Sequence, residues 1–198
     1  MKDAADALLA GEPVILPTDT VYGLCAVASE PGPTERLYAL KGRPLSQPSA
    51  LLAADFEMLI ECIPEIEGRA EAVARALLPG PYTLILPNPA HRYRWVTGEN
   101  PGAIGVRVVT LPDRADRIVT HVGCVVATSA NRPGEPEPRR VEDVPDEFRA
   151  AAGAVVDAGE LPGRASTVID FTGEQPRVLR EGAGSVGEAL ERAARALA

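Results

Sequence analysis

Three pairs of polar or charged side chains in this 198-residue sequence are spaced two residues apart. Residues two apart point to the same face of an extended chain, so each pair could present two side chains to one ligand. The pairs are Thr18 with Thr20, Lys41 with Arg43, and Ser129 with Asn131. A further cation, Arg107, lies in the expected strand Ile104–Val109. Hydroxyl, cationic and amide groups at strand ends are what a ligand with phosphate and carboxylate groups needs.

Each of these segments also has a structural interpretation. Residues 18–20 follow a proline, and Thr-Asp-Thr is common turn chemistry. Residues 41–43 can form a solvated helix end, and residues 129–131 can be an ordinary loop entrance. Arg107 is harder to explain in this way, because an arginine among apolar residues either occupies the polar face of a sheet or enters a site. No single segment decides between structure and function.

Composition and charge limit the classes of function. The chain is 45% hydrophobic and 24% charged, as in ordinary globular proteins. Its formal charge of −8 argues against nucleic-acid binding by the whole surface but not against a local basic pocket. The sequence has no apolar run of about 18 residues, and its start, MKDAAD, lacks the features of a signal peptide. We therefore expect a cytoplasmic protein without a membrane partner.

Cysteines and histidines offer little for catalysis. Cys25, Cys62 and Cys124 are odd in number and lack CxxC spacing, which argues against a disulfide framework and a zinc site. We interpret them as buried small hydrophobes. His91 lies in a proline-rich loop and His121 near a helix end, so neither is a good member of a catalytic triad. The sequence identifies no catalytic residue.

The elements that must position these side chains follow from periodicity and turn signals. Val14–Ala28 reads as strand, polar corner and strand. The other expected strands are Ser49–Ala53, Tyr82–Leu86, Ile104–Val109, Cys124–Ala127, Ala154–Asp157, Ser166–Phe171 and Arg177–Arg180. The expected helices are Ala4–Ala10, Glu35–Leu40, two within Asp55–Leu78 separated at Pro64, Asp113–Val122, Val141–Ala151 interrupted by Pro145, and one capped by Ser185 and Glu188. Strands interspersed with helices, without strict βαβ repetition, predict one α/β domain over residues 1–198, with a mixed sheet and flanking helices.

A glycine motif near the C-terminus needs separate treatment. Residues 182–187 match GxGxxG between an expected strand and an expected helix. A dinucleotide-binding fold needs a further strand with an acidic residue about 20 positions on, whereas the sequence given ends at Ala198. We expect no Rossmann site here, and we retain Arg180 as a candidate phosphate ligand.

Seven segments in this order resemble the YrdC domain of threonylcarbamoyl-AMP synthases, also called TsaC. The segments are PTDTVYGL (17–24), KGRP (41–44), PGPYTLIL (79–86), GVRV (105–108), TSANRPGEP (128–136), STVID (166–170) and LREGA (179–183). Each is weak alone, but their joint order is specific and spans about residues 12–184.

The resemblance implies a twisted, open α/β sheet with a large, concave, positively lined cavity. It implies a nucleotidyltransferase that joins L-threonine, bicarbonate and ATP into threonylcarbamoyl-AMP and pyrophosphate. That product serves the tRNA modification N6-threonylcarbamoyladenosine. The implied partners are Mg²⁺ with ATP and a downstream threonylcarbamoyl transferase complex, with tRNA bound weakly at most. Longer relatives carry a further C-terminal domain, so the expectation is the short, single-domain form.

The resemblance also assigns residues. The ATP-binding set is Lys41, Arg43, Ser129, Asn131 and Arg180. The threonine-binding set is Thr18, Thr20, Arg107 and Ser166. Arg107 is the expected clamp for the threonine carboxylate, because a planar guanidinium pairs with both oxygens. No protein metal site is implied.

Two other readings of the same resemblance are retained. A YciO-type paralogue would use the cavity to bind RNA or nucleotide without making the intermediate; the cation and amide pairs and the acidic net charge favour the synthase. A carbamoyl-transfer domain of a hydrogenase-maturation protein is less favoured, since such domains occur in longer chains with zinc-finger cysteines.

Overall fold

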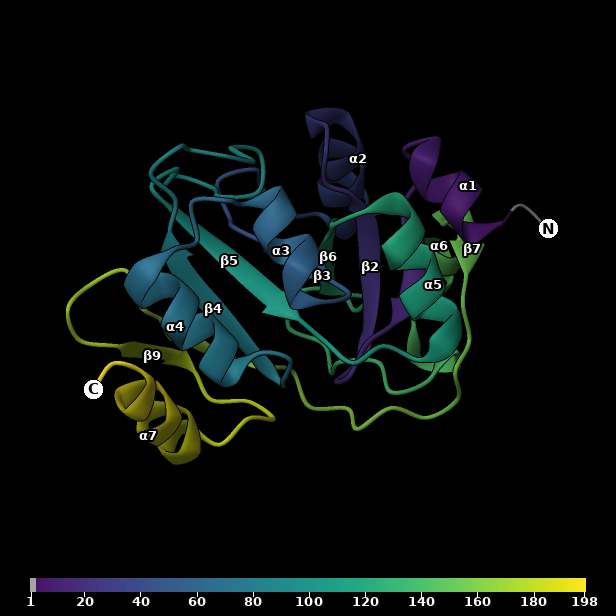
Figure 1. The fold of residues 1–198 in the computed structure, drawn as a ribbon. Helices are drawn as coiled ribbons and strands as arrows, with labels where there is room; N and C mark the ends of the chain where they lie inside the picture. Colours follow the sequence, from purple (N-terminus) through teal and green to yellow (C-terminus); the bar gives the residue numbers. More distant parts are fainter. Residues whose placement is uncertain (1–2) are drawn as a thin grey trace.

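The computed structural model describes residues 3–198, which form a nine-stranded mixed sheet in the order β7-β1-β2-β6-β3-β5-β4-β8-β9 (Figure 1). The strands are β1 (Val14–Pro17), β2 (Tyr22–Val27), β3 (Ala50–Ala53), β4 (Tyr82–Pro87), β5 (Ala103–Val108), β6 (Val125–Ser129), β7 (Ala154–Val155), β8 (Thr167–Asp170) and β9 (Arg177–Arg180). The helices are α1 (Ala4–Leu9), α2 (Pro31–Lys41), α3 (Phe56–Cys62), α4 (Gly68–Leu77), α5 (Asp113–Val122), α6 (Asp146–Ala151) and α7 (Val186–Ala196), with a 3₁₀ turn at Val141–Asp143. The predicted α/β class with a mixed sheet is confirmed.

One face of the sheet carries the larger core. Alternate residues of β5, namely Ile104, Val106 and Val108, are buried in this core with apolar residues of α3 and α4. Figure 1 shows α3 and α4 lying across β5 and β4, and α7 packs against α4 at the same end. The alternation leaves Gly105 and Arg107 on the opposite face of the sheet.

The opposite face is covered at one end only. Apolar residues of α1 and α5 pack over Val14, Leu16, Cys25 and Val125, which belong to β1, β2 and β6. In Figure 1 these two helices lie near the N-terminal end of the chain, whereas β9 and α7 lie at the other end. The helices on this face therefore leave the part formed by β3, β5, β4 and β8 available for a cavity.

Local sequence signals explain most element boundaries. The chain breaks between α3 and α4 around Pro64 and before α6 at Pro145, as proline requires. The hydroxyl of Ser185 accepts a hydrogen bond of 3.4 Å from the backbone N–H of Glu188, which caps α7 as expected. Helix α2 begins at Pro31 instead of the predicted residue 35, because proline is favourable in a first helical turn. Within residues 3–198, no helix is long and apolar enough to cross a membrane.

The glycines of the GxGxxG segment serve close packing. A Cβ atom on Gly182 would lie 2.2 Å from the carbonyl oxygen of Ala165, and one on Gly184 would lie 2.3 Å from the ring of Tyr82. Glycine is needed where backbone or a ring approaches this closely. The segment thereby brings the chain after β9 against the β4–β8 pair, which gives the motif a packing role.

Tyr22 provides a test of what holds the β1–β2 hairpin to the C-terminal half. Its hydroxyl lies 2.8 Å from the carbonyl oxygen of Gly159 and 3.0 Å from a carboxylate oxygen of Asp157, and it accepts the N–H of Ala158 at 3.0 Å. Tyr22→Phe should lower the free energy of unfolding by about 1–3 kcal/mol, because these groups lose a shared partner. Urea denaturation checks this. A midpoint equal to wild type would show that water replaces the hydroxyl at no cost.

Candidate functional site

A cavity of about 560 Å³ lies on the uncovered part of the sheet. Its floor follows one cross-strand row, in which each residue is paired with the next on the neighbouring strand. The row is Ala127, Ala50, Gly105, Ile85, Asp170 and Arg177. Three small residues stand at one end of this row and a charged pair stands at the other. The space therefore exists because the middle of the sheet carries almost no side-chain volume.

Most of the predicted site residues meet at this cavity. The seven that line it are Thr18, Thr20, Arg43, Arg107, Ser129, Ser166 and Arg180. Lys41 and Asn131 are not among the lining residues, and both are buried beside Ser129. The residues come from the β1–β2 corner, the chain just after α2, strands β5, β6 and β9, and the residue that precedes β8, which are far apart in the sequence.

The β1–β2 corner presents two hydroxyls, as the spacing predicts. The Oγ1 atoms of Thr18 and Thr20 lie 3.1 Å apart, and the Thr18 hydroxyl also donates to the carbonyl oxygen of Val21 at 2.7 Å. The backbone N–H groups of Thr20 and Val21 donate to the Thr18 oxygen at 3.2 Å. These bonds fix the corner, so both of its interpretations, turn chemistry and a cavity wall, apply to the same residues.

Arg107 reaches the same corner from β5. Its Nη2 donates to Oδ1 of Asp19 at 2.6 Å, and it lies 3.5 Å from the hydroxyl of Thr20. Burial raises the pKa of the Asp19 carboxyl, and the neighbouring Arg107 charge opposes that shift. Burial also lowers the pKa of Arg107, against the pull of Asp19. The Nε atom of Arg107 is buried without a hydrogen-bond partner, so the guanidinium keeps unused donor capacity.

Ser166 and Arg180 form the adjoining wall. The hydroxyls of Ser166 and Thr83 lie 2.7 Å apart. Arg180 donates to the carbonyl oxygen of Ser166 at 2.8 and 3.1 Å and to its hydroxyl at 3.2 Å. Arg180 is thereby oriented by β8 while its guanidinium lines the cavity.

Lys41 and Arg43 do not form the extended pair that their spacing suggested. Lys41 is the last residue of α2, and Gly42 follows in the left-handed conformation with a φ of 66°. The helix end therefore sends the two side chains to different partners. Arg43 lies 5.6 Å from the ring of Tyr38 and 3.4 Å from the hydroxyl of Thr128.

The ammonium of Lys41 binds the end of β6 and the loop after it. It donates to the carbonyl oxygen of Ser129 at 2.6 Å, to Oδ1 of Asn131 at 2.9 Å and to the carbonyl oxygen of Asn131. The hydroxyl of Ser129 also donates to Oδ1 of Asn131, at 2.6 Å. Burial lowers the pKa of Lys41 to about 8, and the charge of Arg43 adds to this shift. The cation thus holds the loop that carries the predicted amide pair.

Sequence reasoning missed part of the cavity wall. Asp170 accepts hydrogen bonds from Thr172 at 2.6 Å and from Arg177 at 2.6 Å. Burial acts to raise the pKa of Asp170, but these hydrogen bonds outweigh it and lower the pKa. A signal was available, since Asp170 ends the STVID segment and Arg177 begins the next strand. The sequence did not indicate where the Asp19 carboxylate points, because a residue in a turn has no fixed face.

The chemistry of the wall suits anionic groups. Four arginines line the cavity: Arg43, Arg107, Arg177 and Arg180. Within residues 3–198, no group of three or more histidine, cysteine or acidic side chains is arranged to hold a metal ion. Guanidinium groups of this kind suit carboxylate or phosphate. The fold and cavity together define an α/β protein whose open sheet carries a concave face lined by cations and hydroxyls.

Comparison with known proteins places this architecture in a family. The profile of the Sua5, YciO and YrdC proteins, described as "Telomere recombination", matches residues 6–182. This chain belongs to the Sua5/YciO/YrdC family.

Individual relatives agree with this assignment. A threonylcarbamoyl-AMP synthase of Pyrococcus abyssi is 36% identical over 183 residues, which cover 92% of this chain and 54% of that protein. A putative threonylcarbamoyl-AMP synthase of Mycobacterium tuberculosis is 32% identical over 180 residues, covering 90% of this chain and 82% of that protein. This chain therefore spans about half of the archaeal relative and most of the mycobacterial one.

Solved structures match the fold closely. The crystal structure of P. abyssi Sua5 complexed with L-threonine matches with a TM-score of 0.85 and 34% identity, over 96% of this chain and 56% of that one. E. coli YciO matches with a TM-score of 0.81 and 26% identity, over 93% of this chain and 90% of that one.

Proposed function

We propose that this protein is an L-threonylcarbamoyladenylate synthase, which makes threonylcarbamoyl-AMP and pyrophosphate from L-threonine, bicarbonate and ATP for tRNA modification. The observation that carries the proposal is the meeting of two different sets of groups in one 560 Å³ cavity. Hydroxyls and Arg107 form one set, and Arg43, Arg180 and the Ser129 loop form the other. The relatives from P. abyssi and M. tuberculosis, which are named as a threonylcarbamoyl-AMP synthase and a putative one, support this proposal.

The threonine end is formed by the β1–β2 corner, Arg107 and Ser166. Arg107 would bind the carboxylate of the amino acid, using donors that its bond to Asp19 leaves free. The hydroxyls of Thr18 and Thr20, 3.1 Å apart, would bind the polar groups on the amino acid's other side. Asp19 holds the guanidinium in place as a positioning residue, and we assign no general base.

The nucleotide end is formed by Arg43, Arg180 and the loop after β6. Arg43 and Arg180 line the cavity and would neutralise the triphosphate, while Ser129 supplies a hydroxyl. Lys41 acts mainly by adding positive charge and by holding Ser129 and Asn131. Magnesium would enter as part of the substrate, bound to the phosphates of ATP, since the chain offers no resident site within its described residues.

The reaction then depends on positioning and charge. The amine of threonine adds to carbon dioxide, derived from bicarbonate, and loses a proton to give a carbamate. An oxygen of the carbamate attacks the α-phosphorus of ATP, and the bond to the β-phosphate oxygen breaks to release pyrophosphate. Three anionic groups must approach one another, so the arginines lower the barrier by neutralising charge. Holding the reactants in one cavity removes much of the entropic cost. The labile product would pass to a downstream threonylcarbamoyl transferase complex.

An assay of pyrophosphate release tests the proposal. Purified protein is incubated with ATP, bicarbonate and Mg²⁺, with and without L-threonine. We expect release that requires both threonine and bicarbonate. If no pyrophosphate is released, or if its release does not depend on threonine, the assignment is wrong.

The second candidate is a YciO-type protein that binds RNA or nucleotide without synthase activity. The close match between the fold of this chain and that of E. coli YciO supports this second candidate. A gel shift with double-stranded RNA, run beside the pyrophosphate assay, separates the two. RNA binding at physiological salt without pyrophosphate release would select the second candidate.

The pKa of Lys41 predicts a pH dependence of ATP binding. Because its pKa is lowered to about 8, Lys41 carries its charge below pH 8 and loses it as the pH rises further. The dissociation constant for ATP should therefore increase between pH 7 and pH 9, by up to about 10-fold for the loss of one positive charge beside the cavity. Calorimetric titrations at several pH values measure this.

Two variants control the pH experiment. Lys41→Met should bind ATP weakly at every pH and show no transition. Arg43→Gln removes a neighbouring positive charge that lowers the pKa of Lys41, so its transition should move to higher pH. A transition unchanged in Lys41→Met would assign the effect to another group.

A further inference from the structure

The proposed reaction leaves one charged pair of the cavity unassigned. Asp170 and Arg177 face each other across the β8–β9 hairpin, residues 167–180, at the end of the floor row. Nη2 of Arg177 donates to Oδ2 of Asp170 at 2.6 Å. The other carboxylate oxygen, Oδ1, accepts the hydroxyl of Thr172 at 2.6 Å and its backbone N–H at 2.8 Å. Both oxygens of Asp170 are therefore occupied by donors from the hairpin itself.

The pair exposes its cation and keeps its anion inside. The side chain of Arg177 is 72% exposed, whereas that of Asp170 is 7% exposed. Within residues 3–198, Asp170 is the one hydrogen-bond partner of the Arg177 guanidinium, so the remaining N–H groups of that side chain are available to a ligand. An ion pair on a convex surface would also leave donors free, but Arg177 lines the cavity.

An irregularity in β9, the last strand of the sheet, brings a second arginine to the same side. The consecutive residues 168 and 169 of β8 pair with Arg180 and Val178, so Leu179 has no partner on β8. In a regular strand, residues three apart point to opposite faces. Here Arg177 and Arg180 both line the cavity, because an extra residue in one strand re-aims the side chains that follow it. Two cations of one strand therefore border the cavity.

We propose that Arg177 binds the terminal phosphates of ATP, the part that is released as pyrophosphate. This inference rests on the proposed function and adds to it a residue that holds the leaving group. The side chain of Arg107, the proposed threonine clamp, is 10% exposed, so the threonine end of the cavity is buried and Arg177 marks an open end. Phosphates at an open end keep part of their water, bind the guanidinium through charge-assisted hydrogen bonds, and leave without crossing the buried part of the cavity.

Calorimetric titrations with three anions test the assignment. ATP, inorganic pyrophosphate and AMP are titrated separately, each with Mg²⁺, into wild type and Arg177→Gln. We expect the variant to bind ATP and pyrophosphate about 5- to 10-fold more weakly, a modest loss because water screens an exposed charge. Its affinity for AMP should change by less than about 2-fold, because AMP lacks the terminal phosphates. A loss of the same size for AMP, or unchanged binding of ATP, would overturn the proposal.

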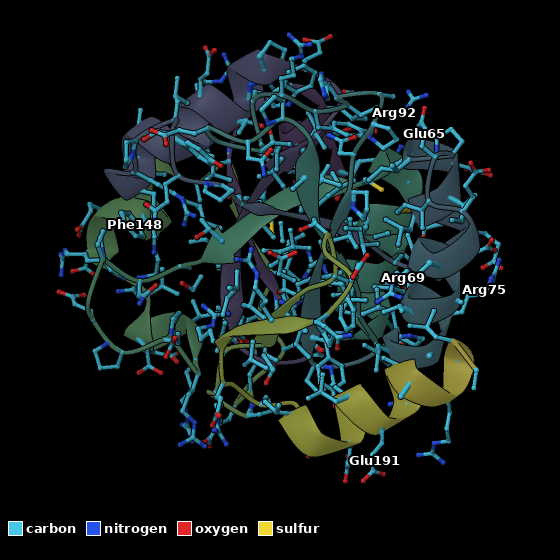
Figure 2. All side chains as sticks on the ribbon, turned by 90° about the vertical axis from the view of Figure 1, so that its left-hand side faces the viewer. Glu65, Arg69, Arg75, Arg92, Phe148 and Glu191 are labelled. Atoms are coloured by element: carbon cyan, nitrogen blue, oxygen red, sulfur yellow. The ribbon has the colours of Figure 1, made fainter. Side chains whose placement is uncertain are left out.

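Arg69→Gln is the matched control for charge and for the stability of the hairpin. Nη2 of Arg69 donates to the carbonyl oxygen of Glu174 in the same hairpin at 2.6 Å, but Arg69 does not line the main cavity. Figure 2 shows Arg69 beside α4, on the side from which it reaches the hairpin. This variant should bind all three anions as wild type does. If it weakened ATP binding as much as Arg177→Gln does, the effect would be one of general charge or hairpin stability, and the proposal would be wrong.

A conservative variant and the wild-type protein complete the test. Arg177→Lys retains the charge without the planar fork, so its loss of ATP affinity should be smaller than that of Arg177→Gln. Circular dichroism checks that each variant is folded. If wild type binds neither ATP nor pyrophosphate, both the proposed function and the role of Arg177 are wrong. If wild type binds both and releases pyrophosphate only with threonine, while Arg177→Gln binds them equally well, only the role of Arg177 is wrong.

Discussion

Arg107→Ala should weaken L-threonine binding by about 100-fold or more, the scale of removing one partner of a buried charged contact. Arg107 is 8% exposed and is the cation that the β5 alternation directs to the corner of Thr18 and Thr20. Its loss would leave the threonine carboxylate without a bidentate partner and would leave Asp19 as an unpaired carboxylate beside it. Calorimetric titration with threonine measures the effect.

Two further variants separate the causes. Arg107→Lys retains the charge without the planar fork, so its loss of affinity should be smaller. Arg107→Ala combined with Asp19→Asn removes the unpaired carboxylate and should recover part of the affinity. If Arg107→Ala bound threonine as well as wild type does, the amino acid would have to bind in another part of the cavity.

Arg43→Ala should weaken ATP binding by about 10- to 100-fold, the scale of a lost charged hydrogen bond. Arg43 lines the cavity where α2 ends, on the side of the Ser129 loop, and its contacts with Tyr38 and Thr128 hold it there. Threonine binding should change by less than about 3-fold, because the contacts that place Arg107 do not involve Arg43. Titrations with each ligand alone measure both constants.

Arg195→Ala is the matched control for loss of one positive charge. Arg195 lies on α7 with a side chain that is 74% exposed, and it does not line the cavity. It should bind both ligands as wild type does. If Arg43→Ala instead weakened threonine more than ATP, and Arg107→Ala did the reverse, the proposed division of the cavity would be inverted.

Local patterns in the sequence determined much of the fold. The apolar residues of 104–109 predicted a strand in which Arg107 either occupies the polar face of a sheet or enters a site, and the structure places Arg107 on the cavity side of β5. The polar corner between two apolar runs predicted the hairpin that presents Thr18 and Thr20. These features depend on the two-residue period of a strand and on turn chemistry, which act between neighbours.

The departures lie where longer-range geometry decides. The two-residue spacing of Lys41 and Arg43 suggested one surface, but the helix extends to Lys41 and turns at Gly42, so the side chains separate. Lys41 instead holds residues 129–131, a partner nearly 90 positions away. No period within the sequence encodes such a contact.

The sequence by itself determined the strands, the helix breaks and the ordered set of segments that resemble one family. The tertiary structure decided what those segments do together. It placed β8 beside β4, so that Ser166 faces Thr83, and it directed Asp19 to Arg107. The reason is physical: periodicity fixes which face a side chain takes, whereas strand order and helix packing fix which faces meet.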